Sequence, residues 1–321
     1  MLRLYCDLSR LHMERPWGAA VYAGQLLDGL LATGEARLVP PEGLEEADVV
    51  LNLDGRFRAG RGQRVVTVIG DLGHLYARRA YNPAAWMWQN WRTASAASRS
   101  DHLLVPSPAV ASGLETYLRV SPARMTVFSP TPSDRFRRPP RSEVEELRRR
   151  LQLPARYFLF VGARSPRKNL RLLGRAFHRA AGLEEVGLVL AGPGAESLPE
   201  ARDLGYVDAS DLPGLIAGAV AWVNPSHYEG SAVGALEAMA CGTPVIATAT
   251  GAQARAIGLS GVLVAPDDAG QLALALSEMA ADRNLRGRLA AAGMRRVEEV
   301  RASAPPPSAL LAALSPLRRR D

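Results

Sequence analysis

Short apolar runs alternate with helix-length amphipathic segments along the first part of the chain. The apolar runs have the length and composition of buried strands. The expected strands cover residues 2–8, 47–53, 64–69, 102–105 and 125–129, and the expected helices cover 18–33, 83–99 and 108–119. Apolar strands separated by helices are typical of a parallel, doubly wound sheet, so an α/β fold is expected.

A stretch rich in proline and arginine interrupts this alternation between residues 130 and 154 and ends in SEVEELRRRL. Acidic residues precede basic ones in that sequence, which is the order that the dipole of a short helix favours. We interpret residues 136–155 as a linker that follows an N-terminal domain over residues 1–135.

A second alternation of strands and helices follows the linker. The expected strands cover residues 157–162, 186–191, 220–224, 244–249 and 261–265, and the expected helices cover 169–181, 210–219, 233–241 and about 267–301. We assign a second Rossmann-like domain to residues 156–300 and a tail to 301–321. In open α/β sheets, ligands bind beyond the carboxyl ends of the strands.

Composition narrows the class of protein. The 321 residues suit two domains, and 47% hydrophobic with 22% charged residues is ordinary for a soluble globular protein. No apolar run reaches the ~18 residues of a membrane span, and the N-terminus lacks a signal pattern, so a cytoplasmic protein is expected. Cys6 and Cys241 form no CxxC pair and fit a reduced compartment.

The net charge of +7 comes almost entirely from arginine, since Lys168 is the only lysine. Such a surplus suits an anionic acceptor or peripheral association with a membrane surface. A solvated, arginine-rich surface is the plainer interpretation. No nucleic-acid partner is expected.

The most informative stretch is NPSHYEGSAVGALEAMACGTPVIA, over residues 224–247. It contains Glu229 and Glu237 around a run of small residues, where a predicted strand gives way to a predicted helix. Backbone N–H groups at a helix N-terminus form a site for an anion. Carboxylates on either side fit a ligand whose anionic part is flanked by hydroxyl groups, such as a nucleotide sugar.

A second candidate site lies in FVGARSPRKNL, over residues 160–170. The guanidinium of Arg167 and the ammonium of Lys168 at the end of a strand suit a diphosphate. The alternative is that both are surface charges. Glu237 suits the two hydroxyls of a ribose, whereas Glu229 suits a hexose hydroxyl or serves as an acid at a helix start.

Residues 157–265 resemble the donor-binding domain of glycosyltransferase family 4 (glycosyl transferases group 1). The members of this family are retaining enzymes of the GT-B fold. The matching pieces are VGARSPRKN, LVLAGPG, LGYVDASDLPGLIAGAVAWVNPS and EG…LEAMACGTPVIA. The N-terminal half resembles the family through VIGDL and HLLVPSPAVASGLETYL. The resemblance implies two Rossmann-like domains that face each other across a cleft.

The resemblance also implies roles for individual residues. Arg167 and Lys168 are expected to bind the donor diphosphate, Glu237 the ribose and Glu229 the donor sugar, so the expected catalytic set is Glu229, Lys168 and Arg167. The other donor-binding positions are Gly162, Gly230, Ser231, Ala232 and Val233, with Tyr206 and Val207 bordering the base.

On the acceptor side the candidates are Gly18, Asp71 and His74. The chain has Gly70-Asp71 where many relatives have His-Asp, so His74 is a candidate substitute, with a solvated loop histidine as the alternative. Ser-Ala-Val-Gly over 231–234 stands where relatives often have Gly-Phe-Gly-Leu-Pro, and the acceptor loop is reduced to Gly-Ala-Ala over 18–20.

Aromatic and histidine residues point to no further site. Trp86, Trp88 and Trp91 crowd one predicted helix, and we interpret them as a packed core face rather than a sugar-stacking surface. The histidines show no metal-ligand spacing, so no metal site is expected; those considered are His12, His102, His178 and His227.

The sequence therefore predicts a retaining hexosyltransferase that uses a nucleotide diphosphate sugar and no cofactor. Its acceptor would be a glycan, a lipid or a small molecule. The alternative is a non-catalytic GT-B protein that binds nucleotide sugars as a scaffold. An epimerase or phosphorylase is a weaker alternative, and the absence of GxGxxG after the first strand of either half argues against a dinucleotide dehydrogenase.

Overall fold

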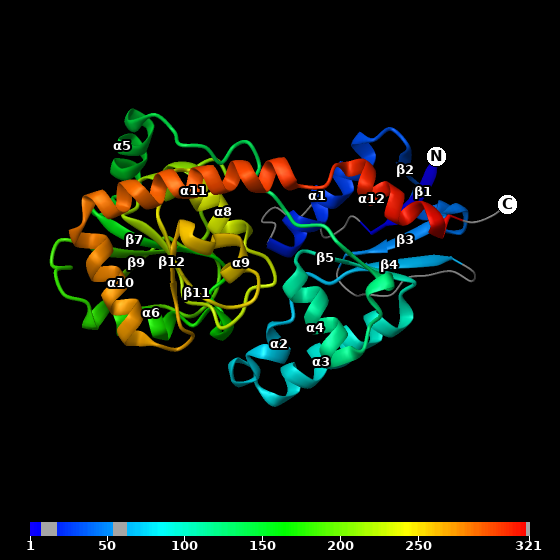
Figure 1. The fold of residues 1–321 in the computed structure, drawn as a ribbon, viewed down its shortest axis with the longest axis horizontal. Helices are drawn as coiled ribbons and strands as arrows, with labels where there is room; N and C mark the ends of the chain where they lie inside the picture. Colours follow the sequence, from blue (N-terminus) through cyan, green and yellow to red (C-terminus); the bar gives the residue numbers. More distant parts are fainter. Residues whose placement is uncertain (8–17, 54–62, 319–321) are drawn as a thin grey trace. The chain divides into compact units, whose positions relative to one another are not determined.

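The structure, a computed structural model, describes residues 1–7, 18–53 and 63–318 (Figure 1). Leu8, at the end of the first predicted strand, and His12 lie outside the described residues. The chain divides into two compact units, Met1–Pro130 with Ala304–Asp321, and Thr131–Ser303. None of the helices described is both long and apolar enough to cross a membrane.

The described part of the first unit contains a parallel sheet of six strands in the order β2-β1-β3-β4-β5-β6. The strands are β1 (Leu2–Cys6), β2 (Ala36–Leu38), β3 (Val49–Asn52), β4 (Arg64–Val68), β5 (His102–Val105) and β6 (Met125–Val127). The helices are α1 (Gly18–Ala32), α2 (Gly73–Tyr76), α3 (Pro83–Arg99), α4 (Pro108–Leu118) and α12 (Pro307–Leu314). Short 3₁₀ turns cover Pro41–Glu46, Arg78–Ala80, Pro122–Arg124 and Ser315–Leu317.

Local sequence explains where the predicted helices of this unit begin. Asn82 caps α3 by accepting a hydrogen bond from the N–H of Ala85 at 2.8 Å, and Ser107 caps α4 by accepting one from Val110 at 3.3 Å. Each cap is followed by a proline, which suits the first helical position because its missing N–H is not needed there.

The second unit has the corresponding architecture, with strands in the order β12-β11-β10-β7-β8-β9, again all parallel. The strands are β7 (Tyr157–Val161), β8 (Gly187–Ala191), β9 (Ala201–Asp203), β10 (Ala221–Asn224), β11 (Val245–Thr248) and β12 (Val262–Val264). The helices are α5 (Arg141–Arg150), α6 (Leu170–Arg179), α7 (Leu212–Ala217), α8 (Val233–Ala240), α9 (Gln253–Ile257), α10 (Ala269–Ala281) and α11 (Arg283–Ser303). Turns of 3₁₀ type cover Pro166–Lys168 and Gly258–Ser260.

The core of the second unit lies on both faces of its sheet. Alternate side chains of a strand point to opposite faces. Phe158 and Phe160 of β7 accordingly pack with α6 and α10, whereas Tyr157 and Leu159 pack with α7, α8 and α11. Figure 1 shows α6 and α11 on opposite sides of this sheet. Burial on both faces explains why these strands read as continuous apolar runs.

The predicted α/β fold with two Rossmann-like domains is therefore confirmed. The strands β2 and β9 were not predicted, because each has three residues at a sheet edge and carries no periodic pattern. The segment expected as a linker, 136–155, contains α5, and its Phe136, Leu147 and Leu153 join the core of the second unit. The segment expected as a tail contains α12. The domain limits at residues 135, 156 and 300 stay predictions.

The interpretation of the tryptophans of α3 as one core face is wrong. Trp88 and Trp91 are 54% and 67% exposed, whereas the buried residues of this helix are Thr93, Ala96 and Ala97. Residues of a helix share a face at spacings of three, four and seven. Trp86, which is half-buried, therefore aligns with Thr93, whereas Trp88 lies about 200° around the helix from it.

The docking of α12 yields a test of the first unit. Leu310 is fully buried among residues of β1 and α1. Leu310→Ala should lower the free energy of unfolding by about 2–5 kcal/mol through lost burial and a residual cavity. Urea denaturation measures this loss. Leu274→Ala, at a position 60% exposed, is the matched control and should cost less than about 0.5 kcal/mol; equal losses in the two variants would refute this packing.

Candidate functional site

The order of strands in the second unit indicates where a ligand would bind, namely at the carboxyl ends of its two central strands. The chain runs outward from β7 through β8 to β9, and then from β10 through β11 to β12 on the other side. β7 and β10 are hydrogen-bonded neighbours, so the direction of winding reverses between them. In open α/β sheets, ligands bind beyond the carboxyl ends of the strands at this switch point.

The segment after β7 places two cationic side chains, Arg167 and Lys168, at the carboxyl end of that strand. Pro166–Lys168 forms a 3₁₀ turn, and Asn169 adopts a left-handed conformation with φ 54° before α6 begins. The side chain of Asn169 donates to Asp267 at 2.9 Å, and the carbonyl of Arg167 accepts from the N–H of His227 at 3.0 Å. The turn is therefore anchored to the segments after β10 and β12.

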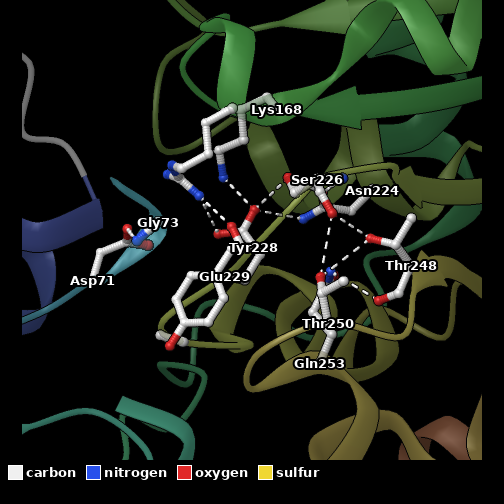
Figure 2. Close-up of polar contacts among 12 residues, drawn as sticks. Asp71, Gly73, Lys168, Asn224, Ser226, Tyr228, Glu229, Thr248, Thr250 and Gln253 are labelled. Carbon is white, nitrogen blue, oxygen red and sulfur yellow. Dashed lines mark hydrogen bonds and ion pairs between the residues drawn. The ribbon is translucent and has the colours of Figure 1, made fainter. Parts of the chain in front are cut away.

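Both cationic side chains contact the carboxylate of Glu229, and Figure 2 shows the contact with Lys168. The ammonium of Lys168 lies 2.5 Å from Oε1 of Glu229, and the guanidinium of Arg167 lies 3.4 Å from Oε2. Arg167 also donates to the carbonyl of Tyr228 at 2.5 Å. The structure thus brings together the three residues predicted as the catalytic set, from two loops on either side of the switch point.

Polar side chains after β10 complete the surroundings of this carboxylate. Oε1 of Glu229 lies 2.6 Å from the hydroxyl of Ser226 and 3.1 Å from the amide nitrogen of Asn224. The carbonyl of Ser226 accepts hydrogen bonds from the hydroxyls of Thr248 and Thr250, at 2.5 and 3.2 Å. Oε1 therefore carries most of the bonds, and Oε2 has only the longer contact with Arg167 among the described residues.

Gly251 lets the next loop approach Glu229. It has φ 53°, and a side-chain Cβ at this position would lie 2.1 Å from the carbonyl oxygen of Glu229. That carbonyl accepts from the N–H of Ala252 at 2.9 Å. Only glycine fits both the left-handed backbone and the close approach.

The ionisation of Glu229 follows from these contacts. The residue is 8% exposed. Burial raises its pKa, but the charges of Lys168 and Arg167 and the bonds from Lys168 and Ser226 outweigh burial and lower the pKa to about 2. Glu229 is therefore a carboxylate at any physiological pH.

Glu237 has the opposite character. It lies in the second turn of α8 and is half-buried, and its carboxyl group makes no hydrogen bond with the described residues. Burial raises its pKa to about 7, although the charge of Arg135 acts against this shift. A partly buried carboxyl group without a partner is suited to accept hydrogen bonds from a ligand.

The start of α8 has the features predicted for a phosphate site. Gly230 and Ala232 are buried, Ser231 and Val233 are half-buried, and the first turn contains no acidic residue. Ala232, at the N-cap, makes no side-chain hydrogen bond, and the N–H of Val233 donates to the hydroxyl of Ser231 at 3.2 Å. A helix start with this composition can accept an anion.

The remaining predicted donor-side residues lie after β7 and β9. Gly162 directly follows β7, and its carbonyl oxygen would be 2.1 Å from a Cβ on Gly192, which has φ 128°. The N–H of Gly192 in turn donates to the carbonyl of Gly205 at 2.6 Å, just before Tyr206 and Val207, which are both half-buried. These contacts gather the loops after β7, β8 and β9.

The predicted acceptor-side residues belong to the first unit. Gly18 opens α1. Asp71 accepts a hydrogen bond from the N–H of Gly73 at 2.5 Å. His74 is 4% exposed rather than solvated, its Nε2 has no hydrogen-bond partner among the described residues, and burial lowers its pKa. The roles of these three residues stay predictions.

Sequence reasoning assigned no role to the residues that hold Glu229 in place. Asn224 and Ser226 stood within the family-like NPS motif, which was the available signal, but spacing alone did not show that they contact a carboxylate. Thr248 and Thr250 gave no signal. Asp268 caps α10 by accepting hydrogen bonds from the N–H groups of Gly270 and Gln271. Across the residues described, no group of three or more His, Cys, Asp and Glu side chains is placed to hold a metal ion.

Part of the second unit matches a known protein family. Residues 155–282 match the family described as Glycosyl transferases group 1. This part of the chain is therefore similar to that family. The match covers β7 to α10 and so includes Arg167, Lys168, Glu229 and Glu237.

Individual relatives match over part of the chain. The O-antigen chain mannosyltransferase B of Escherichia coli is 32% identical over 44% of this chain and 42% of its own length. A D-inositol 3-phosphate glycosyltransferase of Actinosynnema mirum is 34% identical over 60% of this chain and 52% of its own length. The chain therefore spans about half the length of these relatives.

Solved structures share the whole fold. Sucrose-phosphate synthase from Thermosynechococcus elongatus superposes with a TM-score of 0.76, covering 99% of this chain and 98% of that chain at 20% identity. Anabaena Alr3699/HepE in complex with UDP-glucose also gives 0.76, over 98% and 100% of the two chains at 16% identity. The predicted GT-B fold is confirmed.

The ionisation of Glu229 can be tested through stability. Its pKa of about 2 lies below the ordinary 4.5, so the carboxylate stabilises the folded state above pH 4.5 and loses this contribution as the pH falls towards 2. Glu229→Gln should lower the free energy of unfolding by about 3–5 kcal/mol near neutral pH, because it leaves Lys168 and Arg167 half-buried without their partner.

The difference between wild type and Glu229→Gln should shrink as the pH falls below 4.5, measured by urea denaturation at several pH values. Glu278→Gln, at an exposed position of α10, is the matched control and should show little difference at any pH. A loss in Glu229→Gln that stays constant with pH would contradict this assignment.

Proposed function

We propose that the chain is a retaining glycosyltransferase that moves a hexose from a nucleotide diphosphate sugar to an acceptor hydroxyl. The observation that carries the proposal is the contact of Glu229 with Lys168 and Arg167 at the switch point of a unit that matches the group 1 family over residues 155–282. Glu229, which stays ionised at physiological pH, fixes two cationic side chains at the carboxyl ends of the strands, where ligands of such sheets bind.

The cations and the start of α8 suit the diphosphate. An ammonium has three N–H donors and a guanidinium five, so both groups can contact phosphate oxygens while keeping Glu229. Positive charge fixed before the reaction stabilises the negative charge that develops on the departing diphosphate, and one such donor contributes roughly 3–4 kcal/mol. The small residues of 230–233 allow close approach to the backbone N–H groups.

The two glutamates suit the two ends of the donor. Glu237 would accept hydrogen bonds from the two hydroxyls of the ribose, as a carboxylate with two acceptor oxygens can. Oε2 of Glu229, with its longer contact to Arg167, would accept a hydroxyl of the hexose. Oε1 would keep Lys168 in place, so Glu229 both contacts the sugar and positions the cations.

Retention of configuration follows from this geometry if the acceptor attacks on the face that the diphosphate leaves. The departing diphosphate, its charge held by Arg167 and Lys168, would take the proton of the acceptor hydroxyl. The bond between the anomeric carbon and the diphosphate oxygen breaks as the bond to the acceptor oxygen forms. No enzyme nucleophile is needed in this scheme.

A UDP-sugar is the donor to test first, since a fold neighbour was solved in complex with UDP-glucose. Two relatives are a mannosyltransferase of O-antigen chains and a D-inositol 3-phosphate glycosyltransferase. For this chain, a glycan, a lipid or a small molecule is proposed as the acceptor class, and GDP- and ADP-sugars belong in the same screen.

Binding of UDP should release a proton from Glu237. The free carboxyl group has a pKa of about 7, and the ribose requires its ionised form, so UDP affinity should rise through about pH 6–8 and then level off. Calorimetry in two buffers of different ionisation enthalpy measures the proton release.

Glu237→Gln is the control for this titration, because it removes the ionisable group and leaves the titration of UDP itself. The variant should bind UDP more weakly and lose the part of the proton release that is due to Glu237. Identical proton release in wild type and variant would count against Glu237 as the ribose ligand.

The catalytic proposal is tested by following UDP release from UDP-glucose, with and without simple acceptors. Lys168→Ala should lower turnover by ~10²-fold or more, because a donor at the leaving group is lost. Arg171→Ala is the matched control, since this α6 side chain is 89% exposed. Near-wild-type turnover in a folded Lys168→Ala variant would contradict the proposal.

UDP-sugar binding without turnover in the wild type would favour a non-catalytic binding module.

A further inference from the structure

Helix α3 presents large apolar side chains to solvent. Met87, Trp88 and Trp91 are 60%, 54% and 67% exposed. They lie on the first half of the helix, at spacings that keep them on neighbouring faces, opposite the buried Thr93. Figure 1 shows α3 beside α2 and α4 in the first unit. Three large apolar side chains exposed together on one helix, two of them tryptophans, are characteristic of an interaction surface rather than of ordinary surface composition.

The charged residues in the stretch of sequence that carries these side chains are all positive. Residues 72–100 contain Arg78, Arg79, Arg92 and Arg99 and no aspartate or glutamate. The acidic residues that bound this stretch in the sequence are engaged, because Asp71 accepts from Gly73 and Asp101 pairs with Arg64 at 2.6 Å.

Two of these arginines lie over indole rings. The guanidinium of Arg92 is 4.7 Å from the ring centroid of Trp88, and that of Arg78 is 4.5 Å from that of Trp86. The indole of Trp86 also donates to the carbonyl of His74 at 3.1 Å, which joins α2 to α3. We call the set Met87, Trp88, Trp91, Arg78, Arg79 and Arg92 the Trp–Arg surface.

We propose that the Trp–Arg surface docks on a lipid bilayer with anionic headgroups. Tryptophan side chains are stable at the level of the headgroups, where an apolar ring and a polar N–H are both accommodated. Arginines at the same level attract anionic lipids and are screened by salt. Helix α3 would lie in the plane of the interface, with Met87, Trp88 and Trp91 inserted.

Two other partners fit the charge and geometry less well. An isologous contact between two copies would place the same patch against itself, and so arginine against arginine, and residues 72–100 supply no carboxylate to offset that repulsion. A single-stranded nucleic acid would stack bases on exposed aromatic faces, but one face of Trp88 is already covered by Arg92.

The proposal concerns binding alone, so its outcome is independent of whether the chain transfers sugars. The full chain is sedimented with vesicles of phosphatidylcholine alone and with vesicles that also contain phosphatidylglycerol. We expect binding to the anionic vesicles, weakened by salt, and at least about tenfold weaker binding to the neutral ones.

Two variants separate the apolar and the charged parts of the surface. Trp88→Ser/Trp91→Ser should weaken binding to anionic vesicles by at least about tenfold, and Arg78→Gln/Arg79→Gln by about tenfold with a smaller dependence on salt. Leu259→Ser/Leu274→Ser changes two apolar side chains that are 100% and 60% exposed in the second unit, and it should bind as wild type. Circular dichroism confirms that each variant is folded.

Three results would overturn the proposal. The first is no sedimentation with anionic vesicles, and the second is binding that neither double variant weakens. The third is that the Trp88→Ser/Trp91→Ser variant abolishes self-association or binding of a labelled oligonucleotide while vesicle binding is unchanged, which would assign the surface to that partner instead.

Discussion

The buried carboxylate of Glu229 is the constraint on which the site depends. An ionised group at 8% exposure is tolerated only when opposite charges and hydrogen bonds compensate it, and here Lys168, Arg167, Ser226 and Asn224 do so. The same contacts fix two cations after β7 against the loop after β10. Because these strands flank the switch point of the sheet, satisfying one buried charge also builds a positive site where the fold places its ligands.

The two glutamates eight positions apart are set up differently by their surroundings. Glu229 is compensated before any ligand arrives, so its pKa is about 2 and its position is fixed. Glu237 is half-buried without a hydrogen-bond partner among the described residues, so its pKa is about 7 and its compensation must come from a ligand. One carboxylate therefore organises protein groups, whereas we propose that the other accepts hydrogen bonds from the hydroxyls of a ribose.

The sequence predicted most of the fold because strands such as Tyr157–Val161 are buried on both faces and read as continuous apolar runs. Motifs around Lys168 and Glu237 also predicted the residues that the structure brings into contact, Arg167, Lys168 and Glu229, whereas the role of Glu237 stays a prediction. Contacts between distant loops were not predictable, since no pattern shows that Ser226 and Asn224 hold Glu229 or that Gly251 admits the next loop. Trp88 and Trp91 were misassigned because tryptophans within six residues were counted as one face, although Trp86 and Trp88 point apart.

A crystal structure of the protein with UDP tests the central claim most directly. The account predicts diphosphate oxygens within about 3 Å of the Lys168 ammonium, the Arg167 guanidinium and the backbone N–H groups that open α8. It also predicts the two ribose hydroxyls on the carboxylate of Glu237, with Glu229 still bonded to Lys168. Density for UDP away from the carboxyl ends of β7 and β10, or a diphosphate that contacts neither cation, would contradict it.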